Sequence, residues 1–421
     1  MSKSNIIKRL SIPFATLIGL IIISLLLMVL ATSIPRSAIR SNIASTVAHI
    51  HEEGGYPIVR IPVLLMDNFT DCLMCNIVLS ADSCSLAEKV LLNPTHIDST
   101  NKQIEQTYLW TQGKYYPNKR HYGRYWHGYQ VPLSLLLLVT DYKGIRVFNG
   151  ILYYLLLGCS LWLMKLRLGW RPAVAFFFAI SVVAAPVVVP LSLQFYGCHV
   201  IMLAATITVL LRKRQAKDCL HIDFTIFLTI GAITAFIDLF TTPIITLGMP
   251  LACYIAYHNP KNTTKTFLLF SLAWLIGYAG MWVSKWILAT AITGEDVIAN
   301  AIDKANLRTV GHNFYLDTLN SIKPLINNAM SWFTANTAGI IILSLIIISI
   351  TGVGVLLLRS RKSLKQQAWL LAIGALPIIW FCIILQHSIS HFFFTWRAIL
   401  VTIFAIVTMV LFSFKLKNHG T

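Results

Sequence analysis

Charged residues are scarce in this chain of 421 residues. They make up 12% of the sequence, about half of the roughly 25% that is usual in soluble proteins. Acids are the scarcer kind, with 16 Asp and Glu against 34 Lys and Arg, and 56% of the residues are hydrophobic. Apolar runs of about 20 residues, enough to cross a bilayer, recur along the chain. The composition therefore predicts an all-α polytopic membrane protein.

Other missing features narrow the function further. No glycine-rich phosphate loop follows a strand, so ATP-driven chemistry on the inner side is not expected. The chain has no internal repeat and no inverted symmetry of broken helices, which weighs against a transporter. No block of basic residues with interleaved aromatics marks a nucleic-acid site, so the net charge of +18 needs another explanation.

Hydropathy predicts about ten membrane-spanning helices. The first covers residues 11–34, an apolar run longer than the 7–15 residues of a signal-peptide core, so we expect an uncleaved helix. The other nine are expected at 145–164, 172–190, 195–211, 222–240, 243–258, 266–288, 337–358, 367–385 and 393–414. With ten spans, both termini lie on the same side of the membrane.

The distribution of basic residues provides an independent test of this topology. The segments assigned to the inside hold 18 of the 34 basic residues and only Asp218 and Asp223 among the acids. These basic residues lie in short turns, as the positive-inside rule requires. The charge therefore orients the protein in a cell membrane, with both termini in the cytoplasm, and indicates no nucleic-acid partner.

Two long segments are expected outside, within a single membrane domain that covers residues 1–421. The first, residues 36–144, separates the first two spans, and the second, residues 290–336, separates the seventh and eighth. Loops of this length are usually functional or disordered, and their aromatic content argues against disorder. Val131 to Val139 is apolar but too short to cross a bilayer, so we expect interfacial helices in the first loop.

Asp67 and Asp71 are the candidate catalytic residues of the first loop. On a helix, residues four apart share one face, with Cβ atoms about 5–6 Å apart. Such a pair could hold a divalent cation, or one carboxylate could take a proton from an acceptor hydroxyl. The alternative is structural, because Asp67 or Asn68 could cap a helix that begins there.

Aromatic and basic residues crowd the segment 115–129. Its sequence contains Arg124, Tyr125, Trp126 and His127 in a row. A guanidinium suits phosphate or pyrophosphate, and aromatic faces can stack on sugar rings. The alternative is a belt of aromatic residues at the membrane interface. We expect these four residues to contact a substrate, and to lie close to Asp67 and Asp71.

The beginning of the last span carries a second group of candidates. His387 and His391 have helical spacing, and Arg397 lies about two turns further in. No acid accompanies the two histidines, so a zinc site is not expected. An ionisable residue at membrane depth is a functional hypothesis by default, which also applies to Asp238. The structural alternative is an ion pair of Asp238 with Arg397 or with Arg146.

Cys72, Cys75 and Cys84 are the cysteines of the outer segments. Three residues cannot all pair, so a disulfide framework is not indicated. A single bridge from Cys84 to Cys72 or Cys75 would need an oxidising compartment, and the alternative is that all three are small buried residues.

This layout resembles the GT-C superfamily of integral-membrane glycosyltransferases, which use polyprenyl-phosphate-linked sugars. Members of that family have long outer loops between helices one and two and between helices seven and eight. The resemblance implies a catalytic Asp in the first loop, matched by Asp67 or Asp71. It also implies basic groups that hold the lipid phosphate, matched by Arg124, His127 and Arg397. This sequence departs from the family in placing its Asp far beyond the first helix.

The resulting expectation is a glycosyltransferase that acts on the outer face of the membrane. Its partners would be a lipid-linked sugar donor, a glycan or lipid acceptor of the cell envelope, and membrane lipids. The competing interpretations are a transporter or flippase of lipid-linked sugars, which should carry several charges deep inside its helices, an O-antigen-type polymerase, and a non-enzymatic membrane scaffold.

Overall fold

The structure is a computed structural model. It describes residues 3–59, 64–80, 84–97, 102–114, 118–213, 220–309 and 361–413, and the isolated helical positions 327, 330, 331, 334, 340, 341, 344, 347 and 348. The span predicted at 337–358 therefore lies largely outside the described residues, as does most of 290–336 after Thr309.

The chain is an all-α membrane protein, 81% helical and without strands in the residues that the structure describes. Six helical segments there are long and apolar enough to cross a bilayer. They are Ser11–Ser33 within α1 (Lys3–Ser33), α6 (Tyr142–Leu168), α8 (Leu193–Leu211), α9 (Leu220–Ile237), α11 (Thr263–Thr293) and the segment Phe392–Leu411. These six correspond to six of the predicted spans.

Three further predicted spans are helical but shorter than expected. The span 172–190 is divided into α7 (Trp170–Ala179) and a π-helix, η4 (Ile180–Ala184), which ends at Ala185 with a left-handed φ of 52°. Pro186 and Pro190 follow, and proline cannot donate a helical hydrogen bond. The other two are α10 (Ile245–His258), 14 residues long, and the apolar part Gln367–Ile383 of α15 (Arg361–Ile383).

The last span is also less regular than the sequence predicts. It contains α17 (Phe392–Thr395), a 3₁₀ turn, η7 (Trp396–Ile399), and α18 (Leu400–Ser413), and the short helix α16 (Leu385–Ser390) precedes it. Arg397 therefore lies in a 3₁₀ turn and not in a continuous helix.

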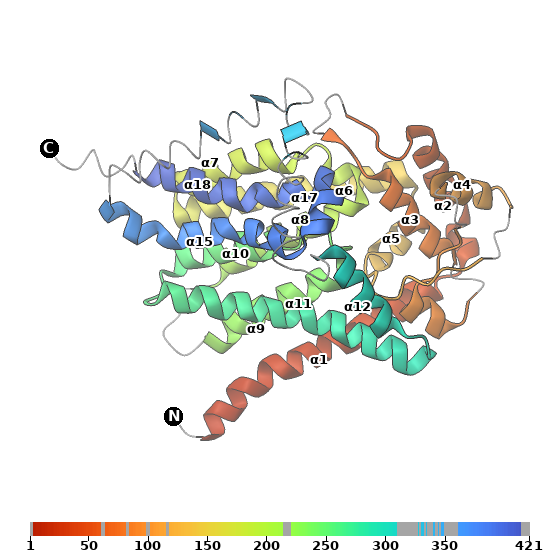
Figure 1. The fold of residues 1–421 in the computed structure, drawn as a ribbon, viewed down its shortest axis with the longest axis horizontal. Coiled ribbons are helices and arrows are strands. Elements are labelled where there is room, and N and C mark those ends of the chain that lie inside the picture. The colour runs from red at the N-terminus through yellow and green to blue at the C-terminus, as the bar shows by residue number, and fades with distance from the viewer. Residues whose placement is uncertain are drawn as a thin grey trace.

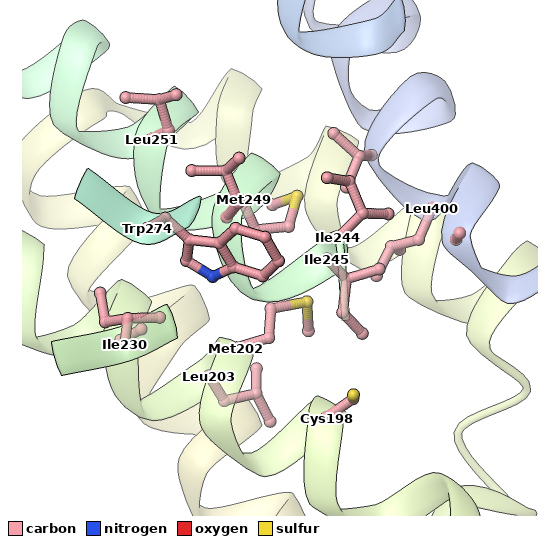
Figure 2. Close-up of a cluster of buried hydrophobic side chains, with 14 of the residues drawn as sticks. Cys198, Met202, Leu203, Ile230, Ile244, Ile245, Met249, Leu251, Trp274 and Leu400 are labelled. Carbon is pink, nitrogen blue, oxygen red and sulfur yellow. The ribbon is translucent and has the colours of Figure 1, made fainter. Parts of the chain in front are cut away.

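The main core lies between the long helices. Trp274 of α11 lies beside Met249 of α10 and Met202 of α8 (Figure 2). Its indole nitrogen donates to Thr246 Oγ1 at 3.0 Å, so the polar atom of this buried ring is satisfied. Helices α9 and α11 approach each other closely, because a Cβ on Gly231 would meet the carbonyl oxygen of Trp274 at 2.0 Å.

The first long loop forms a helical layer at one end of this bundle (Figure 1). Its described helices are α2 (Arg36–Glu53), α3 (Asn68–Leu79), the π-helix η3 (Glu88–Leu92), α4 (Gln103–Thr111) and α5 (Gln130–Leu137). They enclose a second core that contains Ile43, Val47, Cys75 and Leu133. Helix α5 corresponds to the short apolar segment predicted at Val131 to Val139. A 3₁₀ turn, η5 (Val189–Leu191), precedes α8, and α12 (Val297–Arg308) follows α11.

Glycine is required where α9 and α11 cross, and this gives a test of the fold. A Cβ on Gly277 would lie 2.0 Å from the carbonyl oxygen of Leu228. We expect Gly277→Leu to destabilise the protein by about 1–3 kcal/mol or more, because overpacking forces the backbones apart. Gly158→Leu is the matched control, since nothing lies within 4 Å of its Cβ position. Equal thermal stability of the two variants in detergent would contradict this packing.

Candidate functional site

Asp71 connects the first loop to the bundle. Its carboxylate, fully buried, accepts hydrogen bonds from the backbone N–H groups of Leu193 at 2.8 Å and Gln194 at 2.9 Å. The hydroxyl of Tyr142 also donates to it, at 2.5 Å. Leu193 and Gln194 form the first turn of α8, whose free N–H groups attract an anion. Although burial raises the pKa of Asp71 to about 7, both of its oxygens have partners.

Asp67 is the N-cap of α3, as the structural alternative proposed. Its two oxygens accept from the backbone N–H of Thr70 at 2.9 Å and from the Thr70 hydroxyl at 2.8 Å. The side chain is 1% exposed. Burial raises its pKa to about 6, although the Thr70 bonds and the Arg397 guanidinium act in the opposite direction. The positive charge of Arg397 therefore stabilises the ionised form of Asp67.

The opposite face of α3 lines a large cavity. Phe69 and Leu73, four residues apart, lie on its wall, whereas Asp67 and Asp71 contribute nothing to the lining. The cavity has a volume of about 600 Å³. Its remaining lining residues come from the first loop and from α12: Thr95, Ile97, Gln103, Arg120, His121, Tyr122, Arg124, Asn300 and Lys304. Asp67 and Asp71 therefore do not line the cavity that Arg124 lines.

The lining of this cavity is cationic. Arg120, Arg124 and Lys304 carry permanent charges, and within the described part of the chain no Asp or Glu lines the cavity. None of the three forms an ion pair with a described acid, in contrast to Lys119, which binds Glu88 at 3.2 Å. A concave site with converging cations suits a phosphorylated ligand.

An aromatic groove adjoins this cavity and shares Arg124 and Lys304 with it. The groove has a volume of about 130 Å³ and is otherwise lined by Phe240, Trp282, Trp286, Ala301, Ala305, Arg308, Thr309 and Ile384. The Trp286 indole donates to the carbonyl oxygen of Arg124 at 2.8 Å, which fixes the backbone at the boundary. The Arg124 guanidinium lies 4.2 Å from the centre of the Tyr122 ring. A cationic cavity thus opens next to an apolar groove.

Of the four adjacent candidates in the first loop, only Arg124 lines either cavity. Trp126 is buried, and its indole donates to the carbonyl oxygen of Met281 at 2.6 Å. Tyr125 is buried and accepts a hydrogen bond from Arg308. These two side chains attach the loop to α11 and α12.

The His127 side chain is bonded to other parts of the protein and lines neither cavity. Its ring nitrogens lie 3.0 Å from the Tyr129 hydroxyl and 2.9 Å from the carbonyl oxygen of Tyr122. Burial lowers its pKa to about 3, so the ring is neutral. Its left-handed φ of 56° is uncommon for a residue with a side chain and is tolerated because both ring nitrogens are bound. A neutral, fully bonded imidazole offers no charge to a phosphate.

The ion pairs considered for Asp238 are wrong. Among the described residues Asp238 forms no ion pair, and its carboxylate accepts from the backbone N–H of Thr241 at 2.9 Å. Arg146 instead forms a bidentate salt bridge with Glu53, with two hydrogen bonds of 2.7 Å each. The bidentate geometry of the guanidinium explains this choice, because Glu53 on α2 presents both of its oxygens. Asp238 ends α9 and shapes the turn into α10.

His387 and His391 lie together, as their spacing predicts. Their rings stack at 4.5 Å between centres. His387 Nε2 is 3.1 Å from the carbonyl oxygen of Phe240. Burial, with Arg308 as the next cause, lowers the pKa of His387 to about 3 and lowers that of His391. The pair is therefore neutral and packs behind Phe240, which lines the aromatic groove.

Arg397 is completely buried. Its terminal nitrogens donate to the carbonyl oxygens of Phe393 at 3.0 Å and Leu65 at 3.3 Å. The guanidinium lies 4.2 Å from the centre of the Phe195 ring. These contacts hold the segment before Asp67 against the last span, and Arg397 lines neither the cationic cavity nor the aromatic groove.

Among the described residues no group of three His, Cys, Asp or Glu side chains is placed to hold a metal ion. Cys72, Cys75 and Cys84 form no disulfide with a described cysteine. Cys72 and Cys75 are buried in the core of the first loop, as expected for all three, whereas Cys84 is half-buried.

Four residues of the site were not selected from the sequence: Arg120, His121, Lys304 and Arg308. His121 lies between two acids, with ring nitrogens 3.3 Å from Glu88 and 3.1 Å from Glu295. Lys304 and Arg308 are four residues apart on α12, on the face that carries buried Val297 and Ala301. That helical spacing is the signal in the sequence that indicates a shared face for these residues.

Comparisons with known proteins were made by family models, by sequence and by structure. No family model, no curated protein and no solved structure matches the chain.

The buried carboxyl of Asp67 gives a pH-dependent test. Its pKa is about 6 in the folded protein against 3.8 for an ordinary Asp, so the folded state binds more protons between these values. Folding stability should therefore fall as pH rises from about 4 to about 6, by up to about 3 kcal/mol. Asp67→Asn should remove this part of the decline, because Asn still accepts from Thr70 without carrying charge.

The measurement is the unfolding temperature in detergent at several pH values across this window. Asp303→Asn is the control, since Asp303 is exposed on α12 and should leave the wild-type pH profile unchanged. An Asp67→Asn profile that runs parallel to the wild type would show that Asp67 does not titrate in this range.

Proposed function

We propose that this protein is a membrane glycosyltransferase that takes a sugar from a lipid-phosphate donor and transfers it to a glycan or lipid acceptor of the cell envelope. One observation carries the proposal. A cavity with three permanent cations adjoins a tryptophan-rich groove, and Arg124 and Lys304 belong to both. A lipid phosphate has the same two parts, an anionic group and an apolar chain.

The chemistry of the cavity fits the departure of a phosphate. When the acceptor hydroxyl attacks the anomeric carbon of the sugar, the bond from that carbon to the phosphate oxygen breaks, negative charge develops on the departing phosphate, and the hydroxyl proton passes to that phosphate or to water. Arg124 and Lys304 would offset this charge, and preorganised groups of this kind often provide the largest part of catalysis. The polar side chains of Thr95, Gln103 and Asn300 would hydrogen-bond sugar hydroxyls. The cavity has room for a sugar and an acceptor group together.

The buried charges of the spanning helices support an enzyme over a transporter. Lys285 is fully buried, and its ammonium donates to the carbonyl oxygen of Val90 at 2.7 Å. Asp238 binds the backbone of Thr241, and Arg397 binds two carbonyl oxygens. Lys285 and Arg397 hold segments together, and Asp238 lines only a small cavity of about 70 Å³, whereas a transport path needs charges along a continuous water-filled cavity.

We further propose that the chain crosses a cell membrane about ten times, with both termini in the cytoplasm and the site outside. The excess of basic residues in short turns supports this orientation. Single cysteines at Lys102 and Lys304, in a cysteine-free background, should react with an impermeant thiol reagent on intact cells. A cysteine at Lys362 should react only after lysis. The reverse pattern would overturn the orientation and the outer site together.

The proposed activity is tested with purified protein in detergent. Radiolabelled sugars that are linked to undecaprenol through a phosphate or through a pyrophosphate serve as donors, and an extract of the host envelope supplies acceptors. We expect label to enter the glycan or lipid fraction, and Arg124→Gln to reduce this transfer at least tenfold, in line with the loss of a transition-state donor. Arg124→Lys should retain part of the activity, because it keeps the charge without the fork.

Lys102→Gln is the control, because Lys102 is exposed on the same loop and lines neither cavity. It should transfer as the wild type does. A transporter would produce no product in detergent but would move the labelled lipid across the bilayer of a vesicle. Movement without transfer would therefore replace the proposed function by the transport alternative.

A further inference from the structure

Apart from Arg308, which lines only the groove and donates to the Tyr125 hydroxyl, the basic residues around the two cavities fall into two sets. Arg124 and Lys304 line both the large cavity and the aromatic groove. Arg120 and His121 line only the large cavity. We call Arg124 and Lys304 the shared set, and Arg120 and His121 the second set. A ligand whose apolar chain lies in the groove therefore contacts the shared set close to its chain and the second set farther from it.

The shared set accounts for one phosphate. With the chain against Trp282 and Trp286, the phosphate attached to it reaches the boundary, where Arg124 and Lys304 lie. Trp286 holds the backbone of Arg124 in place. A phosphodiester carries a single negative charge, which these two cations already more than match.

The second set needs a second anion. The backbone of Arg120 exchanges two hydrogen bonds with Thr95, each of 2.9 Å, which fixes its position on the cavity wall. His121 already has partners, because both of its ring nitrogens face carboxylates, of Glu88 and Glu295. Arg120 lines the cavity and forms no ion pair with a described acid.

We propose that the lipid donor is joined to its sugar through a pyrophosphate and not through a single phosphate, with Arg124 and Lys304 on the phosphate next to the chain and Arg120 on the phosphate next to the sugar. This inference rests on the proposed function and names the substrate class of that site. A pyrophosphate diester carries two negative charges, so its charge extends from the shared set to the second set.

Binding to the purified, detergent-solubilised protein tests the inference with four probes: farnesyl phosphate, farnesyl pyrophosphate, farnesol and inorganic pyrophosphate. Farnesyl pyrophosphate should bind at least tenfold more tightly than farnesyl phosphate, since it adds charge-assisted hydrogen bonds. Farnesol lacks the anion and inorganic pyrophosphate lacks the chain, so each should bind more weakly than farnesyl pyrophosphate.

The variants separate the two sets of cations. Arg120→Gln should reduce the affinity for farnesyl pyrophosphate to that for farnesyl phosphate, and Arg120→Lys should restore part of it. Arg124→Gln should weaken both prenyl probes, and Lys102→Gln should weaken neither. Unfolding temperatures show that each variant is folded, and the comparison of the four probes on the wild type needs no variant.

Equal affinity for farnesyl phosphate and farnesyl pyrophosphate would overturn the pyrophosphate inference and leave the proposed function standing. Binding of inorganic pyrophosphate as tightly as the prenyl probe would overturn it as well, because the groove would then hold no chain. Absence of binding by both prenyl probes would remove the inference and the proposed function together.

Discussion

The contact between Asp71 and the first turn of α8 determines how the loop helices lie on the bundle. One carboxylate satisfies the backbone N–H groups of Leu193 and Gln194 and accepts the hydroxyl of Tyr142. Free N–H groups at a buried helix start would otherwise be costly. Because this contact directs one face of α3 toward α6 and α8, the opposite face presents Phe69 and Leu73 to the large cavity. The shape of the candidate site thus depends on an acid that is not part of it.

The cations of the chain divide according to their partners. Arg146 binds Glu53, Arg212 binds Asp223, and Lys119 binds Glu88. Each of these pairs holds two segments together, and the first two also offset the desolvation of their partly buried charges. Arg120, Arg124 and Lys304 instead surround a cavity whose described lining contains no acid. Unpaired charges of one sign around a hollow raise the local concentration of ligands with the opposite charge. This contrast supports a binding role for the three cavity residues and a structural role for the rest.

Much of the fold could be predicted from the sequence, but little of the site. Apolar runs predicted the helices α1, α6, α8, α9 and α11, because a bilayer admits long helices whose backbone groups bond internally. Arg124 was identified from its aromatic and basic surroundings, and it lines both cavities. Asp67 was predicted as either a catalytic acid or a helix cap, and the structure shows the cap. His127, Trp126 and Asp238 are polar or aromatic residues in positions where such residues are uncommon. This pattern is expected both for a residue that contacts a ligand and for a residue that forms a buried structural hydrogen bond. Only the hydrogen-bond partners distinguish the two.

The sequence by itself determined that this is a helical membrane protein, because hydrophobic length and charge scarcity act locally along the chain. The sequence also identified the basic residues that are able to bind an anionic ligand. The tertiary structure decided which of them meet. Arg120 and Arg124 lie some 180 residues before Lys304 in the sequence, and they line one cavity only because α12 folds over the first loop. Only the structure shows that Arg146 pairs with Glu53 and that Asp238 accepts a hydrogen bond from the backbone of Thr241. Such pairings depend on the distances and burial that packing creates, and no local pattern of residues contains them.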